Sequence, residues 1–141
     1  MAAIASSHGS TGLLRQLLAA DIFVLGTPIW IGQPSSVCKR VLERLDAMIH
    51  DMDDRKRMKT YNRVALVAVV GNEDGAHHVS AELYQALSDC GFTIPANGMT
   101  YWVGEAMQSK NYNEFPVRFE VVLRLGADFS DLFEVRGLVR E

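Results

Sequence analysis

The chain has few cysteines, and their positions exclude several kinds of site. Only Cys38 and Cys90 are present among 141 residues, and they lie far apart without a CxxC pair. The sequence therefore predicts neither a zinc site nor a disulfide framework. Each thiol falls within a helical pattern, so we expect both to be small, buried hydrophobic side chains. No metal site is predicted.

The sequence also lacks long apolar runs and an excess of positive charge. It has no run of about 18 apolar residues and no charged segment leading into an apolar one at its start. We therefore expect no membrane partner and a cytoplasmic location. The net charge is −3, and no Lys/Arg cluster alternates with aromatic residues, which argues against nucleic acid as a partner. The densest charged run, residues 51–59, mixes both signs and is expected to be a solvated loop.

The hydrophobic content is sufficient for one α/β domain. Hydrophobic residues make up 48% of the chain, enough for a real core. Residues 22–25 and 63–70 are apolar runs without polar alternation, typical of parallel strands covered by helices on both faces. Helical patterns begin near Pro34 and Ala76, and a third strand is expected at residues 99–103. The sequence predicts a parallel sheet with helices on both faces, within residues 1–112.

The pattern changes after Phe115. Residues 117–125 alternate strictly between apolar and mostly polar positions, which predicts an antiparallel strand with one buried face. We therefore predict a second unit, residues 113–141, as a β-rich tail that is poorly integrated with the sheet.

The loop after the first predicted strand has features suited to a flavin. It lies at the carboxyl edge of the sheet, where α/β folds bind ligands. Trp30 offers a flat apolar wall, Gly32 allows close approach, and the backbone amides offer polar contacts. The alternative is a rigid turn whose Trp30 packs under a helix. The candidate cofactor-binding residues here are Thr27, Pro28, Ile29, Trp30, Ile31, Gly32 and Gln33.

The loop after the second strand occupies the equivalent position. Its candidate cofactor-binding residues are Asn72, Glu73, Asp74 and Gly75. Asn72 and the following amides can bond the pyrimidine edge of a flavin, and the next helix offers its positive end to an anion. The alternative is an ordinary loop in which Asp74 caps that helix.

The sequence offers two further candidate features. The adjacent His77 and His78 point about 100° apart on a helix, which does not suit one metal ion; a surface position or a place near the flavin remains open. A hydroxyl-rich cluster near the start resembles a phosphate loop leading into a helix. Its candidate residues are Ser7, Gly9, Ser10 and Thr11.

Three segments together carry a family resemblance: residues 20–30, 71–76 and 89–92. Over about residues 13–112 the chain resembles the NAD(P)H-dependent FMN reductase branch of the flavodoxin family. The resemblance implies a flavodoxin-like fold, FMN at the strand carboxyl edge, usually across a homodimer, and two-electron transfer from NAD(P)H to a quinone, free flavin or similar small-molecule electron acceptor. It implies that residues 27–33 and 72–75 line the isoalloxazine ring. No catalytic side chain is predicted, because such chemistry needs no nucleophile or base from the protein.

The chain departs from this family at both ends. Family members place a strand, a phosphate loop, a helix and another strand before the segment that matches residues 21–30, whereas about twenty residues precede it here. We therefore expect a sheet that is incomplete on its N-terminal side. Residues 111–137 instead resemble the β-rich N-terminal domain of bacterial glycogen debranching enzymes. Two alternative functions follow: a flavodoxin-like remnant without cofactor, and a carbohydrate-associated β module.

Overall fold

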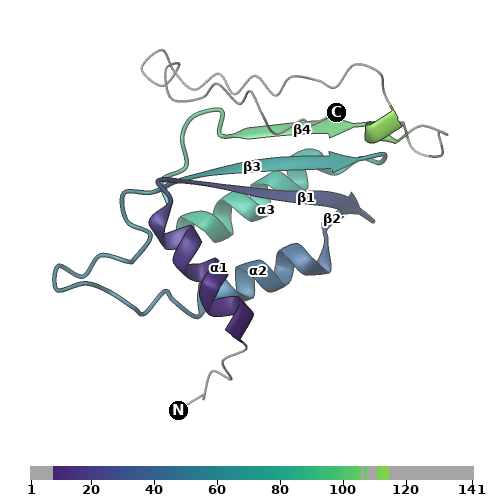
Figure 1. Ribbon diagram of the computed structural model, residues 1–141. Coiled ribbons are helices and arrows are strands. Elements are labelled where there is room, and N and C mark those ends of the chain that lie inside the picture. The colour runs from purple at the N-terminus through teal and green to yellow at the C-terminus, as the bar shows by residue number, and fades with distance from the viewer. Residues whose placement is uncertain (1–7, 106, 108–110, 115–141) are drawn as a thin grey trace.

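The computed structural model of the chain shows an α/β arrangement built on one four-stranded sheet (Figure 1). The structure describes residues 8–105, 107 and 111–114, so the predicted tail lies almost entirely outside the described residues. The prediction of an α/β fold is confirmed. The elements are α1 (His8–Ala19), β1 (Ile22–Trp30), β2 (Gln33–Pro34), α2 (Ser36–Asp46), β3 (Val64–Gly71), α3 (Ala76–Asp89), β4 (Met99–Val103) and a short 3-10 turn (Tyr112–Glu114).

The sheet has the order β2-β1-β3-β4. β1 and β3 pair in parallel, from Ile22 opposite Val64 to Pro28 opposite Val70. β4 pairs with β3 in the same direction, whereas the short β2 turns back antiparallel on the end of β1. α2 and α3 are the crossover helices that two parallel pairings require. As a result, the carboxyl ends of β1, β3 and β4 meet at one edge.

β1 is longer than the sequence predicts. The apolar run indicates a strand over residues 22–25, with a loop from Gly26 onward, but the strand continues to Trp30. Proline disfavours the interior of a strand because it lacks the N–H that a strand ladder uses. Proline is tolerated on an edge strand, and among the described residues β1 has a strand partner on only one side at Pro28.

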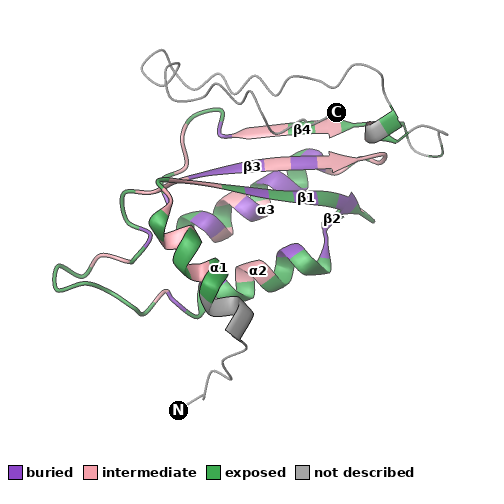
Figure 2. Ribbon diagram, in the orientation of Figure 1, coloured by how far each residue is buried: buried purple, intermediate pink, exposed green. Residues whose placement is uncertain are grey.

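The described helices pack on one face of the sheet. Side chains from α1, α2 and α3 join one hydrophobic cluster with Leu25, Ile29 and Val67 of the strands. On the other face of β1, Val24 and Trp30 are 52% and 60% exposed, and Figure 2 shows β1 largely exposed beside a more buried β3. The sequence predicts helices on both faces; among the described residues they cover only one. An unbroken apolar run is compatible with helices on both faces of a strand, but it does not establish that both faces are covered.

Both cysteines are buried, as predicted. Cys38 and Cys90 are free thiols in the core cluster, and burial raises the pKa of each thiol above its ordinary value. The folded chain therefore retains thiol protons that the unfolded chain loses once the pH passes an ordinary thiol pKa of about 8.5.

This burial predicts a stability that falls with rising pH. We expect the free energy of unfolding, measured in urea, to be lower at pH 9.5 than at pH 7, because only the unfolded thiols ionise over most of that range. The combined variant Cys38→Ala and Cys90→Ala should show a smaller fall than the unmodified protein. Equal falls in the two proteins would contradict this expectation.

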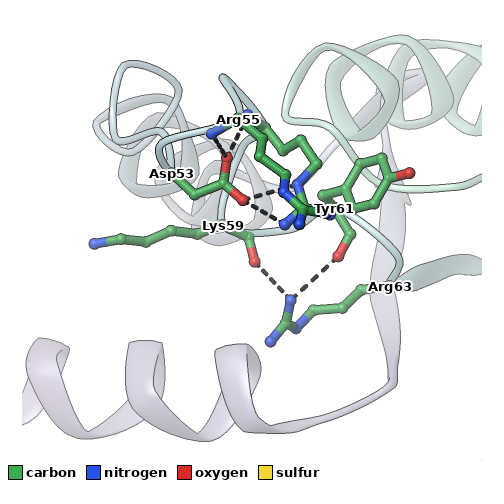
Figure 3. Close-up of polar contacts among 6 residues, drawn as sticks. Asp53, Arg55, Lys59, Tyr61 and Arg63 are labelled. Carbon is green, nitrogen blue, oxygen red and sulfur yellow. Dashed lines mark hydrogen bonds and ion pairs between the residues drawn. The ribbon is translucent and has the colours of Figure 1, made fainter.

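The charged segment between α2 and β3 is a solvated loop organised by Asp53 (Figure 3). One carboxylate oxygen of Asp53 accepts the backbone N–H groups of Arg55 and Arg57 at 2.8 and 2.9 Å, and the other accepts Arg57 Nε at 2.8 Å. The side-chain bond with Arg57 is the main cause that lowers the pKa of Asp53. The prediction of a mixed-charge surface loop is confirmed.

Arg63 fastens the end of this loop to the rest of the protein. Its guanidinium donates to the carbonyl oxygens of Lys59 and Tyr61, at 2.6 and 3.4 Å (Figure 3). Nε donates to the carbonyl oxygen of Leu18, near the end of α1, at 3.0 Å. A pocket of about 420 Å³ lies against this loop. It is at the amino end of β3, opposite the edge where the predicted ligand loops meet. No described helix has the length and apolar character needed to span a membrane.

Candidate functional site

Three loops meet at the carboxyl edge of the sheet. They follow β1, β3 and β4, and two of them are the predicted flavin loops (Figure 1). The N–H of Gly104 donates to the carbonyl oxygen of Gly71 at 2.8 Å, which joins the third loop to the second. Asn72 Nδ2 donates to Asn111 Oδ1 at 2.7 Å and extends this contact. The structure therefore brings residues 27–33 and 72–75 to one edge.

The first loop is a two-residue hairpin turn. Trp30 stands opposite Gln33, and between them Ile31 and Gly32 have φ of 55° and 69°. Two consecutive positive φ values define a type I′ turn, whose twist suits a tight hairpin. Glycine adopts this conformation freely, but a β-branched residue such as isoleucine is strained in it. The Ile31 side chain is 91% exposed, so packing of that side chain does not hold the turn.

A carboxylate from the second loop accepts a hydrogen bond from this turn. The N–H of Ile31 donates to Glu73 Oε1 at 2.7 Å, between residues 42 positions apart in the chain. Ile31 is one of the backbone amides predicted to face a flavin. In the structure, the Ile31 N–H already donates its hydrogen bond to Glu73.

The backbones of the two loops also approach closely at Gly75. Its φ of 126° is rarely adopted by residues with a side chain, and a Cβ atom there would lie 3.0 Å from Gly32 Cα. Beside this contact, Nε2 of Gln33 lies 3.0 Å from Nε2 of His78. The two loops therefore contact each other through backbone, side chains and the Glu73 bond.

α3 begins at this edge without a side-chain cap. Gly75 is its N-cap residue and makes no side-chain capping bond. Asp74, which the alternative interpretation assigns as the cap, accepts the N–H of Gly75 at 2.7 Å. The positive end of the helix thus faces the same edge as the two loops, an arrangement that favours an anion.

The two histidines at the start of α3 have different partners. His77 Nε2 lies 3.0 Å from the Tyr101 hydroxyl, and the two rings meet edge to face with centroids 5.0 Å apart. His78 contacts Gln33 of the hairpin. Within the part of the chain that the structure describes, no group of three or more His, Cys, Asp or Glu side chains is placed to hold a metal ion.

Two residues of the predicted first loop belong to the core. Thr27 and Ile29 are 5% and 2% exposed. Thr27 Oγ1 accepts the N–H of Ser35 at 3.0 Å, and Ser35 Oγ accepts the N–H of Cys38 at 3.2 Å. These bonds join the end of β1 to the first turn of α2. Pro28 and Trp30 alternate with them and are exposed on the other face.

The predicted phosphate loop has a helical conformation. Gly9, Ser10 and Thr11 lie in α1, and Ser7 lies outside the described residues. The composition of residues 9–12 favours a turn, but these residues form the start of α1. The apolar stripe of α1 packs against the core and stabilises the helix as a whole. In Figure 1 the first turn of α1 lies at the bottom of the view, away from the strand tips, so these residues are not brought to the other two loops.

The third loop contributes residues that are not among the predicted site residues. A Cβ atom on Gly104 would lie 2.5 Å from Trp102 Cη2 and 3.0 Å from Asn72 Oδ1, so any side chain at this position would require these two side chains to shift. The rule that loops after parallel strands share one edge points to Gly104 and Tyr101 once the strand at 99–103 is predicted. The contact from Asn111 gives no such signal in the sequence.

Two parts of the chain match known protein families. Residues 6–108 match the family described as NADPH-dependent FMN reductase. Residues 98–141 match the N-terminal domain of (some) glycogen debranching enzymes. The second match lies mostly on residues that the structure does not describe.

Two curated proteins share more than a third of their aligned residues with this chain. The 8-demethyl-8-aminoriboflavin-5'-phosphate synthase of Streptomyces davaonensis is 38% identical over 102 residues, which are 72% of this chain and 40% of that protein. A protein named divalent metal cation transporter MntH, from Mycobacterium bovis, is 39% identical over 100 residues, which are 71% of this chain and 15% of that protein. The chain therefore spans less than half the length of these relatives.

Solved structures support the same fold. RosB, with the bound intermediate 8-demethyl-8-formylriboflavin-5'-phosphate, has a TM-score of 0.68 and 37% identity, over 72% of this chain and 40% of RosB. The Trp repressor binding protein of Bacillus subtilis has a TM-score of 0.56 and 17% identity, over 67% and 58% of the two chains. A WrbA-like flavodoxin from Agrobacterium tumefaciens has a TM-score of 0.54 and 18% identity, over 74% of this chain and 61% of that protein. The prediction of a flavodoxin-like fold is confirmed.

Proposed function

Because the chain belongs to the NADPH-dependent FMN reductase family, we propose that it binds FMN at the carboxyl edge of its sheet. We further propose that it takes part in electron transfer from NAD(P)H to a quinone, free flavin or similar small-molecule acceptor. The observation that carries this proposal is the convergence, at that edge, of exposed Trp30, the loop over residues 72–75 and the uncapped start of α3. A 37% identical protein, RosB, holds a flavin phosphate in its own structure.

The residues at this edge suit a flavin ring. Trp30 is 60% exposed and offers an aromatic wall. The close approach of Gly75 to Gly32 leaves backbone atoms, rather than side chains, where a ring edge would rest. When bound, FMN supplies the two-electron redox chemistry. The protein positions the ring through Trp30 and the hairpin, and it places the positive end of α3 at the same edge.

The family is also the basis on which we propose NAD(P)H as electron donor and assembly as a homodimer. Light scattering of the purified chain tests the assembly. Loss of nicotinamide absorbance in the presence of FMN and a quinone tests the donor, with NADH and NADPH compared at equal concentration.

We expect the chain to bind added FMN and to quench its fluorescence, and we expect Trp30→Ala to raise the Kd about tenfold. The variant loses an aromatic contact worth about 0.5–1.5 kcal/mol in addition to the buried area. Tyr61→Ala is the matched control, because Tyr61 is a similarly exposed aromatic residue at the opposite end of the sheet; its Kd should not change. Folded protein that leaves FMN fluorescence unaltered would disprove the proposed cofactor.

The second candidate function is an α/β domain that binds no flavin. Two observations favour it. Gly9, Ser10 and Thr11 are helical and do not form a phosphate loop. The Ile31 N–H, predicted to bond a flavin, donates to Glu73 instead. Cooperative unfolding together with no response to FMN would support this candidate. Because residues 98–141 match a domain of glycogen debranching enzymes, binding to glycogen in the same preparation would instead support a carbohydrate-associated module.

A further inference from the structure

We infer that Glu73 is a positioning residue that holds the Ile31–Gly32 turn in its strained conformation and thereby fixes the hairpin that presents Trp30. Its effect on FMN affinity rests on the proposed function. The contact on which the inference stands is the bond between Glu73 and the Ile31 amide.

The turn needs support from outside itself. Type I′ turns favour asparagine or aspartate followed by glycine, because both central residues have positive φ. This chain places isoleucine at the first position, with φ of 55°. The side chain is 91% exposed, so it gains little from packing in return for the backbone strain.

Glu73 is placed to supply that support. Its carboxylate oxygen lies 2.7 Å from the Ile31 nitrogen, a distance typical of a charge-assisted hydrogen bond, which is stronger than a neutral one. The neighbours of Glu73 are themselves held: Asn72 bonds to Asn111, and Asp74 accepts the N–H of Gly75. The bond to Asn111 links the residue before Glu73 to the segment after β4.

The consequence of this bond reaches Trp30 through the backbone. Trp30 directly precedes the turn and pairs with Gln33 across the hairpin. If the Ile31–Gly32 turn relaxes to another conformation, the strand twist at Trp30 changes, because the primed turn sets that twist. Glu73 thus acts on Trp30 through the backbone of the turn.

The first test compares variants at Glu73 by FMN titration. Glu73→Ala should raise the Kd for FMN about tenfold, in line with the loss of one hydrogen bond to a charged group. Glu73→Gln should stay within about threefold of the unmodified protein, because an amide oxygen can accept the same bond. Glu43→Ala, on the exposed face of α2, is the matched control and should leave the Kd unchanged.

A second test separates positioning from direct contact with FMN. Ile31→Asn provides a residue that favours the positive φ of this turn, so the turn depends less on Glu73. In that background, Glu73→Ala should change the Kd by less than about threefold. A tenfold loss in both backgrounds would overturn the inference, since Glu73 would then act independently of the turn.

The third test needs no flavin. In FMN-free protein, hydrogen exchange of the Ile31 amide, followed by NMR, should be about tenfold faster in Glu73→Ala than in the unmodified protein or in Glu43→Ala. Unchanged exchange would overturn the inference whatever the flavin data show. Faster exchange in a protein that binds no FMN would support Glu73 as the support of the turn and refute the proposed function alone.

Discussion

Replacing Leu83 with alanine is expected to lower the free energy of unfolding by about 2–5 kcal/mol. Leu83 is completely buried on the inner face of α3 and belongs to the core cluster formed with Val67 and Val69 of β3. Alanine removes apolar surface from the core and leaves a cavity that the tightly packed neighbours fill only in part. Urea denaturation at constant pH measures the change.

The control for this substitution lies in α1. Leu13 is 70% exposed, so Leu13→Ala makes the same chemical change on a helix surface without opening a cavity. The expected change there is within about 0.5 kcal/mol. Similar losses at Leu83 and Leu13 would show that α3 does not pack against the sheet as described.

The second large effect is expected at Gly75. Gly75→Ala should lower the free energy of unfolding by about 1–3 kcal/mol, because its φ of 126° is strained for any residue with a side chain. The new Cβ atom would lie 3.0 Å from Gly32 Cα. Since that neighbour is backbone, it cannot rotate away, and the two loops must separate. We therefore expect a large loss of FMN affinity, measured by fluorescence titration beside the urea curve.

Gly12→Ala is the matched control for Gly75. Gly12 lies in α1, and a Cβ atom there would have no neighbour within 4 Å. Alanine in a helix is favoured over glycine by about 0.5–1 kcal/mol, so this variant should be as stable as the unmodified protein or more stable, with unchanged FMN affinity. If Gly75→Ala behaves like Gly12→Ala, the two loops do not make the close contact described.

Much of the sheet could be predicted from local pattern. The apolar run over residues 63–70 corresponds to β3, which is displaced from it by one residue, and the helical pattern predicted from near Ala76 corresponds to α3, which begins at Ala76. Both elements gain their stability from burial that periodicity reveals. The same reasoning fails where tertiary contacts override composition. Small residues 9–12 form part of α1 because its leucines dock on the core, and β1 runs through Pro28 because it lies at an edge.

The site was predictable as a region but not as a set of contacts. The rule that parallel strands end at one edge places residues 27–33 and 72–75 together. It does not show that Thr27 faces the core, or that Glu73 bonds to Ile31 from 42 positions away. Bonds of that kind depend on register and on strained backbone angles, which leave no periodic trace in a sequence. Strain at Ile31 runs against local preference, so propensity alone could not indicate it.

The bond between Thr27 and Ser35 gives the hairpin a particular thermodynamic character. It closes the segment between these residues into a small ring whose ends are fixed in the core, at β1 and at the cap of α2. The loop-closure entropy of that ring is lost once, when the protein folds. A ligand that binds to the hairpin then loses its own translational and rotational entropy but does not have to order the hairpin. A preorganised surface of this kind increases binding affinity for the same set of contacts. Thr27 is buried, so we expect it to support the hairpin from the core side through its bond to Ser35.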